Sequence, residues 1–205
     1  MRSSGVSALL ARHSMRVFTT GDFATLSGMA PSSASQAVRR LALAGMLGRA
    51  KRGLWVNRMA AGFHPYEVAT RLADPWPAYV SLYSALSDEG IIAEVPGIVY
   101  AVTPAVLRRY RYESSFGRFH LHHLPPRLIW GYRVRHDGLA SYAVADPEKA
   151  FCDLAYLGLT IRSPLGMPRR RAAHWPLKRG KVLECARRFG FPPLMAWAAK
   201  EPFSG

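Results

Sequence analysis

The sequence predicts an α+β fold, in which a small helical module with a basic hairpin leads into a mixed α/β domain with a small, mostly antiparallel sheet and a helical C-terminal tail. Three observations support this prediction. Residues 17–57 combine helix and hairpin patterns, residues 91–145 are rich in β-branched and aromatic residues, and strong helix starts recur after residue 145. The chain has 205 residues, of which 49% are apolar, enough to form a packed core.

The balance of charge indicates a polyanionic partner. Lys and Arg number 28 against 13 Asp and Glu, which gives a formal net charge of +15. Residues 1–58 contain many of these basic residues but a single acidic one, Asp22. The first part of the chain is therefore the expected anion-binding region, and nucleic acid is the expected partner.

Apolar runs and cysteines indicate the compartment. No run approaches the ~20 apolar residues of a membrane-spanning helix, and residues 6–11 are too short for a secretory signal. Cys152 and Cys185 suit a reducing environment and cannot complete a four-thiolate metal site. We therefore expect a cytoplasmic protein without a membrane partner.

Residues 17–57 predict two helices, a turn and a hairpin. Thr19 stands three residues before Asp22, which is the spacing of a capping box, and Gly28 ends the helix that they open. Pro31 then begins a second helix over residues 31–44. A short amphipathic helix over residues 6–13 is expected to precede them.

The second helix has an apolar face and a polar face without acidic residues. Helical spacing places Ala34, Ala37, Val38 and Leu41 on the apolar face. The polar face carries Ser32, Ser33, Ser35, Gln36, Arg39 and Arg40. Glutamine pairs with adenine and arginine with guanine in the major groove, while serine contacts phosphate, so this face predicts recognition of DNA.

A basic hairpin follows, with strands over residues 47–51 and 54–57. Arg49, Lys51 and Arg52 crowd its turn, where they can reach the DNA backbone or minor groove. Trp55 on the second strand is expected to pack against the second helix. Two helices and a basic hairpin in this order are typical of a winged helix-turn-helix. The alternative is a solvated basic hairpin on a small helical domain.

The remainder of the chain predicts helices and short strands. Helices are expected over residues 65–72, 78–87, 182–189 and 192–200, and strands over 98–103, 116–124, 128–134 and 140–145. Asp146-Pro147-Glu148 is the clearest helix start, and Glu148, Lys149 and Asp153 are expected to face outward or lie at the domain edge. Residues 162–171 indicate a basic linker.

No pattern in the sequence favours an enzyme. His120 and His122 would share one face of a strand, but two imidazoles form half of a zinc site. Glu148 and Asp153 are five residues apart and not aligned on a helix, and no glycine-rich phosphate motif is present. We therefore predict no catalytic residue, no cofactor and no metal.

The arginines at 108–112 and 169–171 leave two alternatives open. Arginine beside tyrosine suits stacking on bases, so both runs could extend a nucleic-acid surface. Charge runs are also commonly solvated surface. The sequence does not decide between these interpretations.

Three blocks of the sequence resemble the AbiEi family of antitoxin-type transcriptional regulators from bacterial type IV toxin–antitoxin systems. They are RGLWV at 52–56, AYVSLYSAL at 78–86 and DPEKAFCDL at 146–154. The resemblance implies a winged-helix DNA-binding domain, expected over residues 1–60, and an antitoxin-like domain, expected over 61–160. The residues themselves predict a basic linker and helical tail over 161–205, where the chain departs from the family. It also implies binding to inverted repeats in the promoter, autorepression, and opposition to a nucleotidyltransferase-like toxin.

Palindromic sites pair with two-fold proteins, so a homodimer on double-stranded DNA is expected. Two other functions stay open. The winged helix could be a protein-interaction module that binds a partner directly. A nucleic-acid-processing enzyme with its site in the sheet domain is the other, although no motif supports it.

Overall fold

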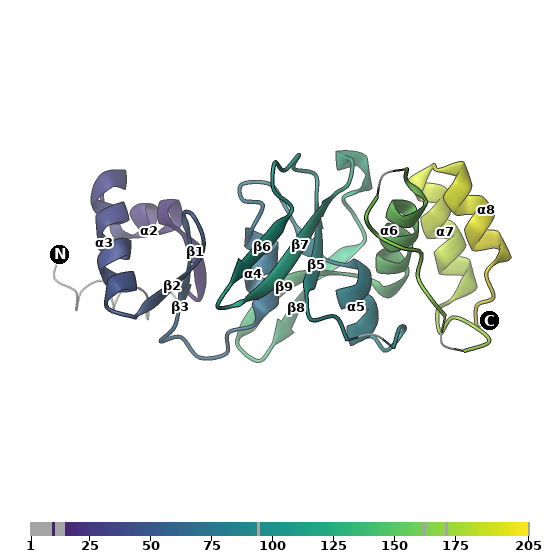
Figure 1. Ribbon diagram of the computed structural model, residues 1–205, viewed down its shortest axis with the longest axis horizontal. Coiled ribbons are helices and arrows are strands. Elements are labelled where there is room, and N and C mark those ends of the chain that lie inside the picture. The colour runs from purple at the N-terminus through teal and green to yellow at the C-terminus, as the bar shows by residue number, and fades with distance from the viewer. Residues whose placement is uncertain (1–9, 11–14, 94, 162, 171, 205) are drawn as a thin grey trace.

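The protein is an α+β protein with its elements spread along one long axis (Figure 1). The computed structural model describes residues 10, 15–93, 95–161, 163–170 and 172–204. These residues form seven α-helices, a three-stranded antiparallel sheet and a six-stranded mixed sheet. The helix expected over residues 6–13 lies outside the described residues, apart from the buried Leu10.

The N-terminal module contains the two predicted helices and the predicted hairpin, together with a first strand that the sequence did not predict. They are β1 (Val17–Thr19), α2 (Thr20–Ser27), α3 (Pro31–Leu43), β2 (Leu47–Lys51) and β3 (Leu54–Asn57). The capping box of Thr19 and Asp22 is confirmed, and Gly28 ends α2 in the left-handed conformation. The strands form an antiparallel sheet in the order β1-β3-β2.

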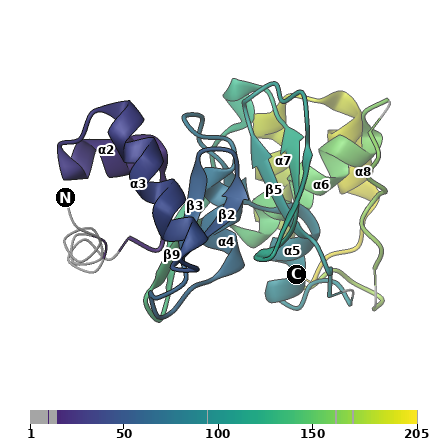
Figure 2. The same cartoon turned by 60° about the vertical axis from the view of Figure 1, so that its left-hand side comes forward.

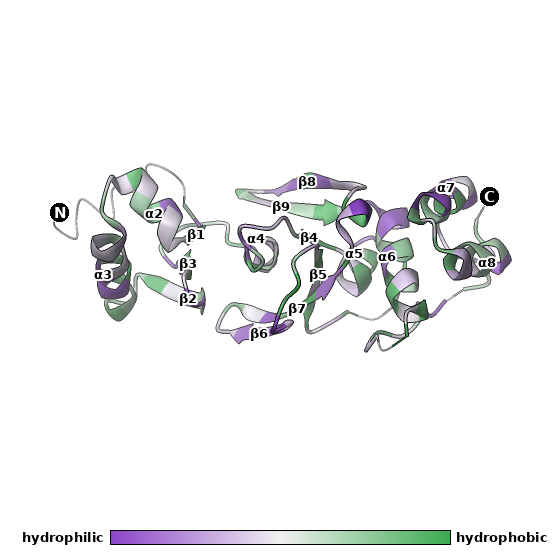
Figure 3. Cartoon of the chain, turned by 90° about the horizontal axis from the view of Figure 1, so that it is seen from above, coloured by the Kyte–Doolittle hydropathy of each residue, from purple (hydrophilic) through white to green (hydrophobic). Residues whose placement is uncertain are grey.

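The small sheet lies between two hydrophobic cores. Phe18 and Leu47 pack with the apolar faces of α2 and α3. Ala50, Leu54 and Val56 belong instead to the core of the rest of the protein. Viewed from above, the sheet lies between α3 and the remaining elements (Figure 3). The N-terminal module is therefore packed onto the body of the protein through an apolar face.

The six-stranded sheet forms the centre of the molecule. Its strands are β4 (Tyr79–Val80), β5 (Val99–Thr103), β6 (Arg111–Ser114), β7 (Gly117–His123), β8 (Tyr132–Asp137) and β9 (Ala140–Ala145), in the order β6-β7-β5-β4-β9-β8. The pairs β5–β7 and β4–β9 are parallel, and the other pairs are antiparallel. Helices α4 (Pro65–Arg71) and α5 (Leu82–Asp88) contact it. The sheet is thus larger and more mixed than predicted.

The structure corrects several predicted boundaries. Residues 78–87 are not one helix, because Tyr79 and Val80 form a central strand before α5 begins. The apolar spacing predicted a helix there, but Tyr79 and Val80 are apolar because they are fully buried in a strand between β5 and β9. Strand β6 was missed, since its exposed arginine and glutamate resemble a solvated charge run. Residues 128–131 precede β8, and Leu128 ends a 3₁₀ turn that begins at Pro126.

Three helices form the C-terminal end of the molecule. They are α6 (Pro147–Leu159), α7 (Arg179–Phe189) and α8 (Pro192–Lys200). Phe151 of α6 packs against Trp175 and Trp197, with ring centroids 4.8 and 5.2 Å apart. Aromatic packing therefore joins the tail to the main core. None of the helices in the described part of the chain is long and apolar enough to cross a membrane.

Candidate nucleic-acid interface

The outer face of α3 is exposed and contains no acidic residue. All six predicted contact residues lie on this face and are exposed to solvent: Ser32, Ser33, Ser35, Gln36, Arg39 and Arg40. The opposite face, including Ala34 and Val38, is buried in the small core. Within the described part of the chain, no ion pair holds either arginine to another element of the protein. The apolar side of α3 is thus packed against the module's core, and its polar side is exposed to solvent.

The first turn of α3 has no capping side chain. Ala30 occupies the N-cap position with φ −57° and ψ 145°, and it cannot accept a hydrogen bond through its side chain. Pro31 follows, and no acidic residue lies in the first turn. The backbone N–H groups of Ser32 and Ser33 are therefore left at the positive end of the helix dipole, a place that favours an anion.

The turn of the β2–β3 hairpin lies beside the end of β1. Thr19 pairs with Leu54, and the N–H of Thr20 donates to the carbonyl of Gly53 at 2.9 Å. The turn consequently does not project beyond the sheet. Trp55 packs with the core of the module and donates from Nε1 to Oγ1 of Thr20, at the start of α2, at 2.9 Å.

The three predicted hairpin residues are placed in two ways. Arg49 and Arg52 are exposed. The Lys51 ammonium instead donates to the carbonyl of Leu72 at 2.7 Å, at the end of α4. Burial lowers the pKa of Lys51, and the nearby Asp74 carboxylate opposes this shift. Lys51 therefore contacts the body of the protein, whereas the two arginines face solvent.

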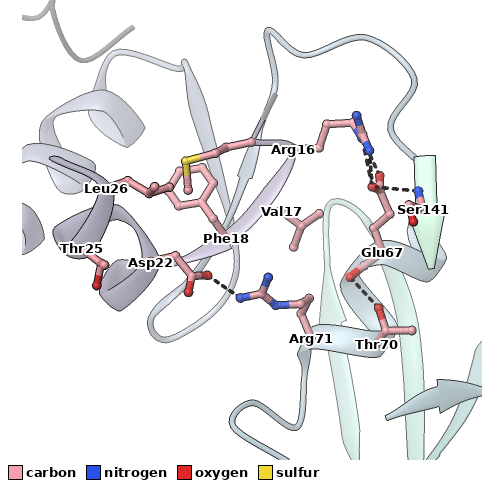
Figure 4. A pocket seen from close by; sticks show the side chains of 11 residues that line it. Arg16, Val17, Phe18, Asp22, Thr25, Leu26, Glu67, Thr70, Arg71 and Ser141 are labelled. Atoms are coloured by element: carbon pink, nitrogen blue, oxygen red, sulfur yellow. Dashed lines mark hydrogen bonds and ion pairs between the residues drawn. The ribbon is translucent and has the colours of Figure 1, made fainter. Parts of the chain in front are cut away.

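Ion pairs join the N-terminal module to α4 around a pocket of about 500 Å³ (Figure 4). Arg16 donates from Nε to both carboxylate oxygens of Glu67, at 2.9 and 3.1 Å. Glu67 is buried and also accepts from the N–H of Ser141 at 3.4 Å. Arg71 of α4 pairs with Asp22 of α2. These contacts fix the orientation of α2, and hence of α3, relative to the body.

The environment of Asp22 favours its ionised form. Partial burial raises its pKa, but a hydrogen bond from the N–H of Thr19 and the charge of Arg71 more than offset this, so the pKa is lowered overall. The same carboxylate therefore caps α2 and pairs with α4. It couples the start of the helical pair to the body of the protein.

A polar network lies in the core beneath α6, where the sequence predicted surface residues. Lys149 and Asp153 are 2% and 0% exposed, so the prediction that they face outward was wrong. They form an ion pair, and Lys149 Nζ also donates to Oη of Tyr79 at 2.8 Å. Asp153 accepts from Oγ of Ser81 at 2.8 Å. Sequence reasoning missed the network because α7 covers α6 on the side assumed to be solvent.

The histidines of β7 lie among aromatic rings, close to Tyr100 and Tyr110. His120 and His122 lie on one face, as predicted, with ring centroids 6.4 Å apart. No group of three His, Cys, Asp or Glu suited to a metal ion occurs among the described residues. Burial, with a smaller contribution from His120, lowers the pKa of His122 to about 4, so this imidazole is neutral at physiological pH.

The two arginine runs have different surroundings. Arg170 pairs with Glu201 at 3.6 Å. Arg109 is exposed, and its Nε donates to the carbonyl of Arg111 at 2.8 Å. Arg109 also lines a hollow together with the β2–β3 hairpin. No local sequence pattern indicates this proximity, because β6 was not recognised as a strand beside the hairpin.

Comparisons with known proteins do not indicate a function for this chain. Neither family models nor curated proteins match this sequence. The strongest functional feature of the described residues is therefore the free, acid-free face of α3, set beside a basic hairpin and held in place by the ion pairs to α4.

Proposed function

We propose that the protein is a DNA-binding transcriptional regulator, and that residues 1–60 form a winged helix-turn-helix. In this proposal α3 is the recognition helix. The observation that supports it most strongly is that the entire polar face of α3 is exposed and lacks acidic residues, while its apolar face is buried. A duplex carries closely spaced negative charges, so a free face without carboxylates suits it.

The residues of α3 divide by the contacts they would make. Gln36 and Arg40 are suited to the edges of bases in the major groove. The uncapped N–H groups at Ser32 and Ser33 are suited to a backbone phosphate. Arg52, at the turn between β2 and β3, would contact the DNA backbone or the minor groove next to the segment bound by α3.

The resemblance to the AbiEi family supports a more specific proposal. The protein would be an autorepressing antitoxin that binds promoter inverted repeats, as a homodimer, and counteracts a nucleotidyltransferase-like toxin. Two of the blocks that resemble the family meet in the structure: Tyr79 and Ser81 of one contact Lys149 and Asp153 of the other. The two blocks therefore contribute side chains to one buried network.

DNA binding is tested by fluorescence anisotropy with a labelled duplex from the promoter upstream of the coding sequence. Arg40→Ala is expected to weaken binding by roughly tenfold or more, since a bidentate arginine–guanine contact is worth about 1–3 kcal/mol. Arg187→Ala is the matched control, because Arg187 is exposed on α7 at the other end of the molecule (Figure 1). Equal effects of both variants would refute a recognition role for α3.

Antitoxin activity is tested separately in cells. A neighbouring nucleotidyltransferase-like gene is expressed from an inducible promoter, with and without this protein. The proposal predicts growth arrest by the toxin and rescue by the wild-type chain. It also predicts rescue by Arg40→Ala, because antitoxicity is assigned to residues 61–160. Failure of the wild-type protein to rescue contradicts the antitoxin proposal and leaves DNA binding as a separate question.

A further inference from the structure

A hollow of about 480 Å³ lies between the β2–β3 hairpin and β6. Figure 2 shows the hairpin beside the strands of the larger sheet, and β2 contacts β6 directly. The polar residues that line the hollow are Arg49, Lys51, Arg52, Arg109, Tyr112 and Glu113. The fold therefore brings basic residues from the N-terminal module and from the sheet domain to one place.

Positive charge in this hollow is poorly neutralised by the protein itself. Arg49, Arg52 and Arg109 form no ion pair within the described ranges. Glu113 is the single carboxylate of the lining. Like charges gathered in a concave surface raise its potential and attract anions.

The donors of the hollow suit a phosphate group. Arg109 is held by the bond from its Nε to the carbonyl of Arg111, which leaves its terminal N–H groups available. Burial raises the pKa of Tyr112, with Arg109 opposing, so the phenol is a neutral hydroxyl donor at physiological pH. Guanidinium groups form paired hydrogen bonds to phosphate oxygens, and a neutral hydroxyl adds another donor.

We propose that this hollow binds a backbone phosphate of duplex DNA beyond the segment that contacts α3, with Arg109 as its principal ligand. The inference rests on the proposed function and deepens it, because it extends the DNA interface from the N-terminal module onto the sheet domain. A strand that contacts the exposed Arg52 at the hairpin turn passes next to Arg109. The contact is made to the backbone, so it adds affinity without sequence preference.

The test is a salt titration of DNA binding by fluorescence anisotropy, with the promoter duplex and with an unrelated duplex of equal length. Arg109→Ala is expected to weaken binding about tenfold on both duplexes and to reduce the slope of log K against log salt by about 0.9. Arg109→Lys should restore the slope, because it keeps the charge. Arg108→Ala is the matched control, since Arg108 is exposed and adjacent but does not line the hollow.

Glu113→Gln provides a variant whose expected effect, tighter DNA binding, cannot be explained by misfolding. Removing the single carboxylate of the hollow should tighten binding several-fold, whereas a loss of structure would weaken it. Thermal unfolding of each variant, monitored by circular dichroism, is expected to match the wild type within a few degrees.

Two outcomes overturn the inference alone, and a third outcome shows failure of the proposed function. If Arg109→Ala and Arg108→Ala behave alike on DNA that the wild type binds, the hollow makes no contact and the DNA-binding proposal stands. An RNA duplex of the promoter sequence is titrated alongside, and if Arg109→Ala weakens binding only to this RNA, the partner of the hollow is RNA. If the wild type binds neither duplex at low salt, the proposed function itself fails.

Discussion

Lys149 and Asp153 form an ion pair that is almost completely buried. Both are enclosed between the sheet and α7, and the ammonium lies 4.8 Å from the ring centroids of both Trp130 and Phe189. Burial raises the pKa of Asp153, while Lys149, Ser81 and Tyr79 oppose the shift. A buried ion pair adds little net stability, but removing one partner strands a charge in a low-dielectric core.

Breaking this pair is expected to be costly and non-additive. Asp153→Leu or Lys149→Met should each lower the free energy of unfolding by about 3–5 kcal/mol, because each leaves a buried charged group without its partner. The double variant Lys149→Met/Asp153→Leu should regain much of the loss. Chemical denaturation measures these values, and additive losses in the double variant would contradict the role assigned to the pair.

Asp22 gives a pH dependence with a defined sign. Its pKa in the folded protein is lowered below its ordinary value of about 4, so its contribution to stability is present above that value and is lost as the pH falls through the folded pKa. Asp22→Asn should therefore be less stable than the wild type at pH 7 and nearly equal to it at the lowest pH at which both fold. Thermal unfolding across the pH range measures this difference, and a gap that widens on acidification would disprove it.

At the level of elements, local signals predicted the N-terminal module well. Capping residues, glycines and prolines determine where α2, α3 and the hairpin strands begin and end, and these signals depend on neighbours in sequence. The central region was harder, because Tyr79 and Val80 are a strand only by virtue of the strands on both sides. Arg109 and the hairpin meet through tertiary packing, which no local pattern reports.

The uncapped start of α3 can be tested by adding a cap. Ala30→Ser places a hydroxyl at an N-cap with suitable backbone angles, so it should raise the free energy of unfolding by about 1 kcal/mol. The added hydroxyl would also occupy an N–H group that we assign to phosphate, so DNA binding should not improve. Denaturation and anisotropy on the same variant check both expectations. Unchanged or lower stability would show that the helix end is already satisfied.

On the scale of the whole molecule, a shared core connects the two sheets. One face of the small sheet lies in the main core. The pair Asp22–Arg71 joins α2 to α4, and Arg16, directly before β1, pairs with Glu67 of α4. The exposed polar face of α3 is therefore attached to the body through this core and these ion pairs rather than through a flexible linker. This arrangement would let a partner bound to the body influence the orientation of α3.

Such packing predicts a single cooperative unfolding transition. Circular dichroism and Trp fluorescence should report the same midpoint, because Trp55 in the N-terminal module and Trp175 near α8 unfold together. Glu67→Gln should lower that midpoint, since it weakens the bond to Arg16 and leaves a buried guanidinium partly unpaired. Two separate transitions in the wild type would show that the N-terminal module is an independent unit.

The most direct test of the central claim is the affinity of the wild type and Arg40→Ala for the upstream promoter duplex, measured by anisotropy with unlabelled competitor DNA. We predict that the wild type prefers the promoter over unrelated DNA, that binding weakens steeply with salt, and that Arg40→Ala loses most of the preference while Arg187→Ala keeps it. A wild-type protein that shows no preference for any DNA at low salt would contradict the account.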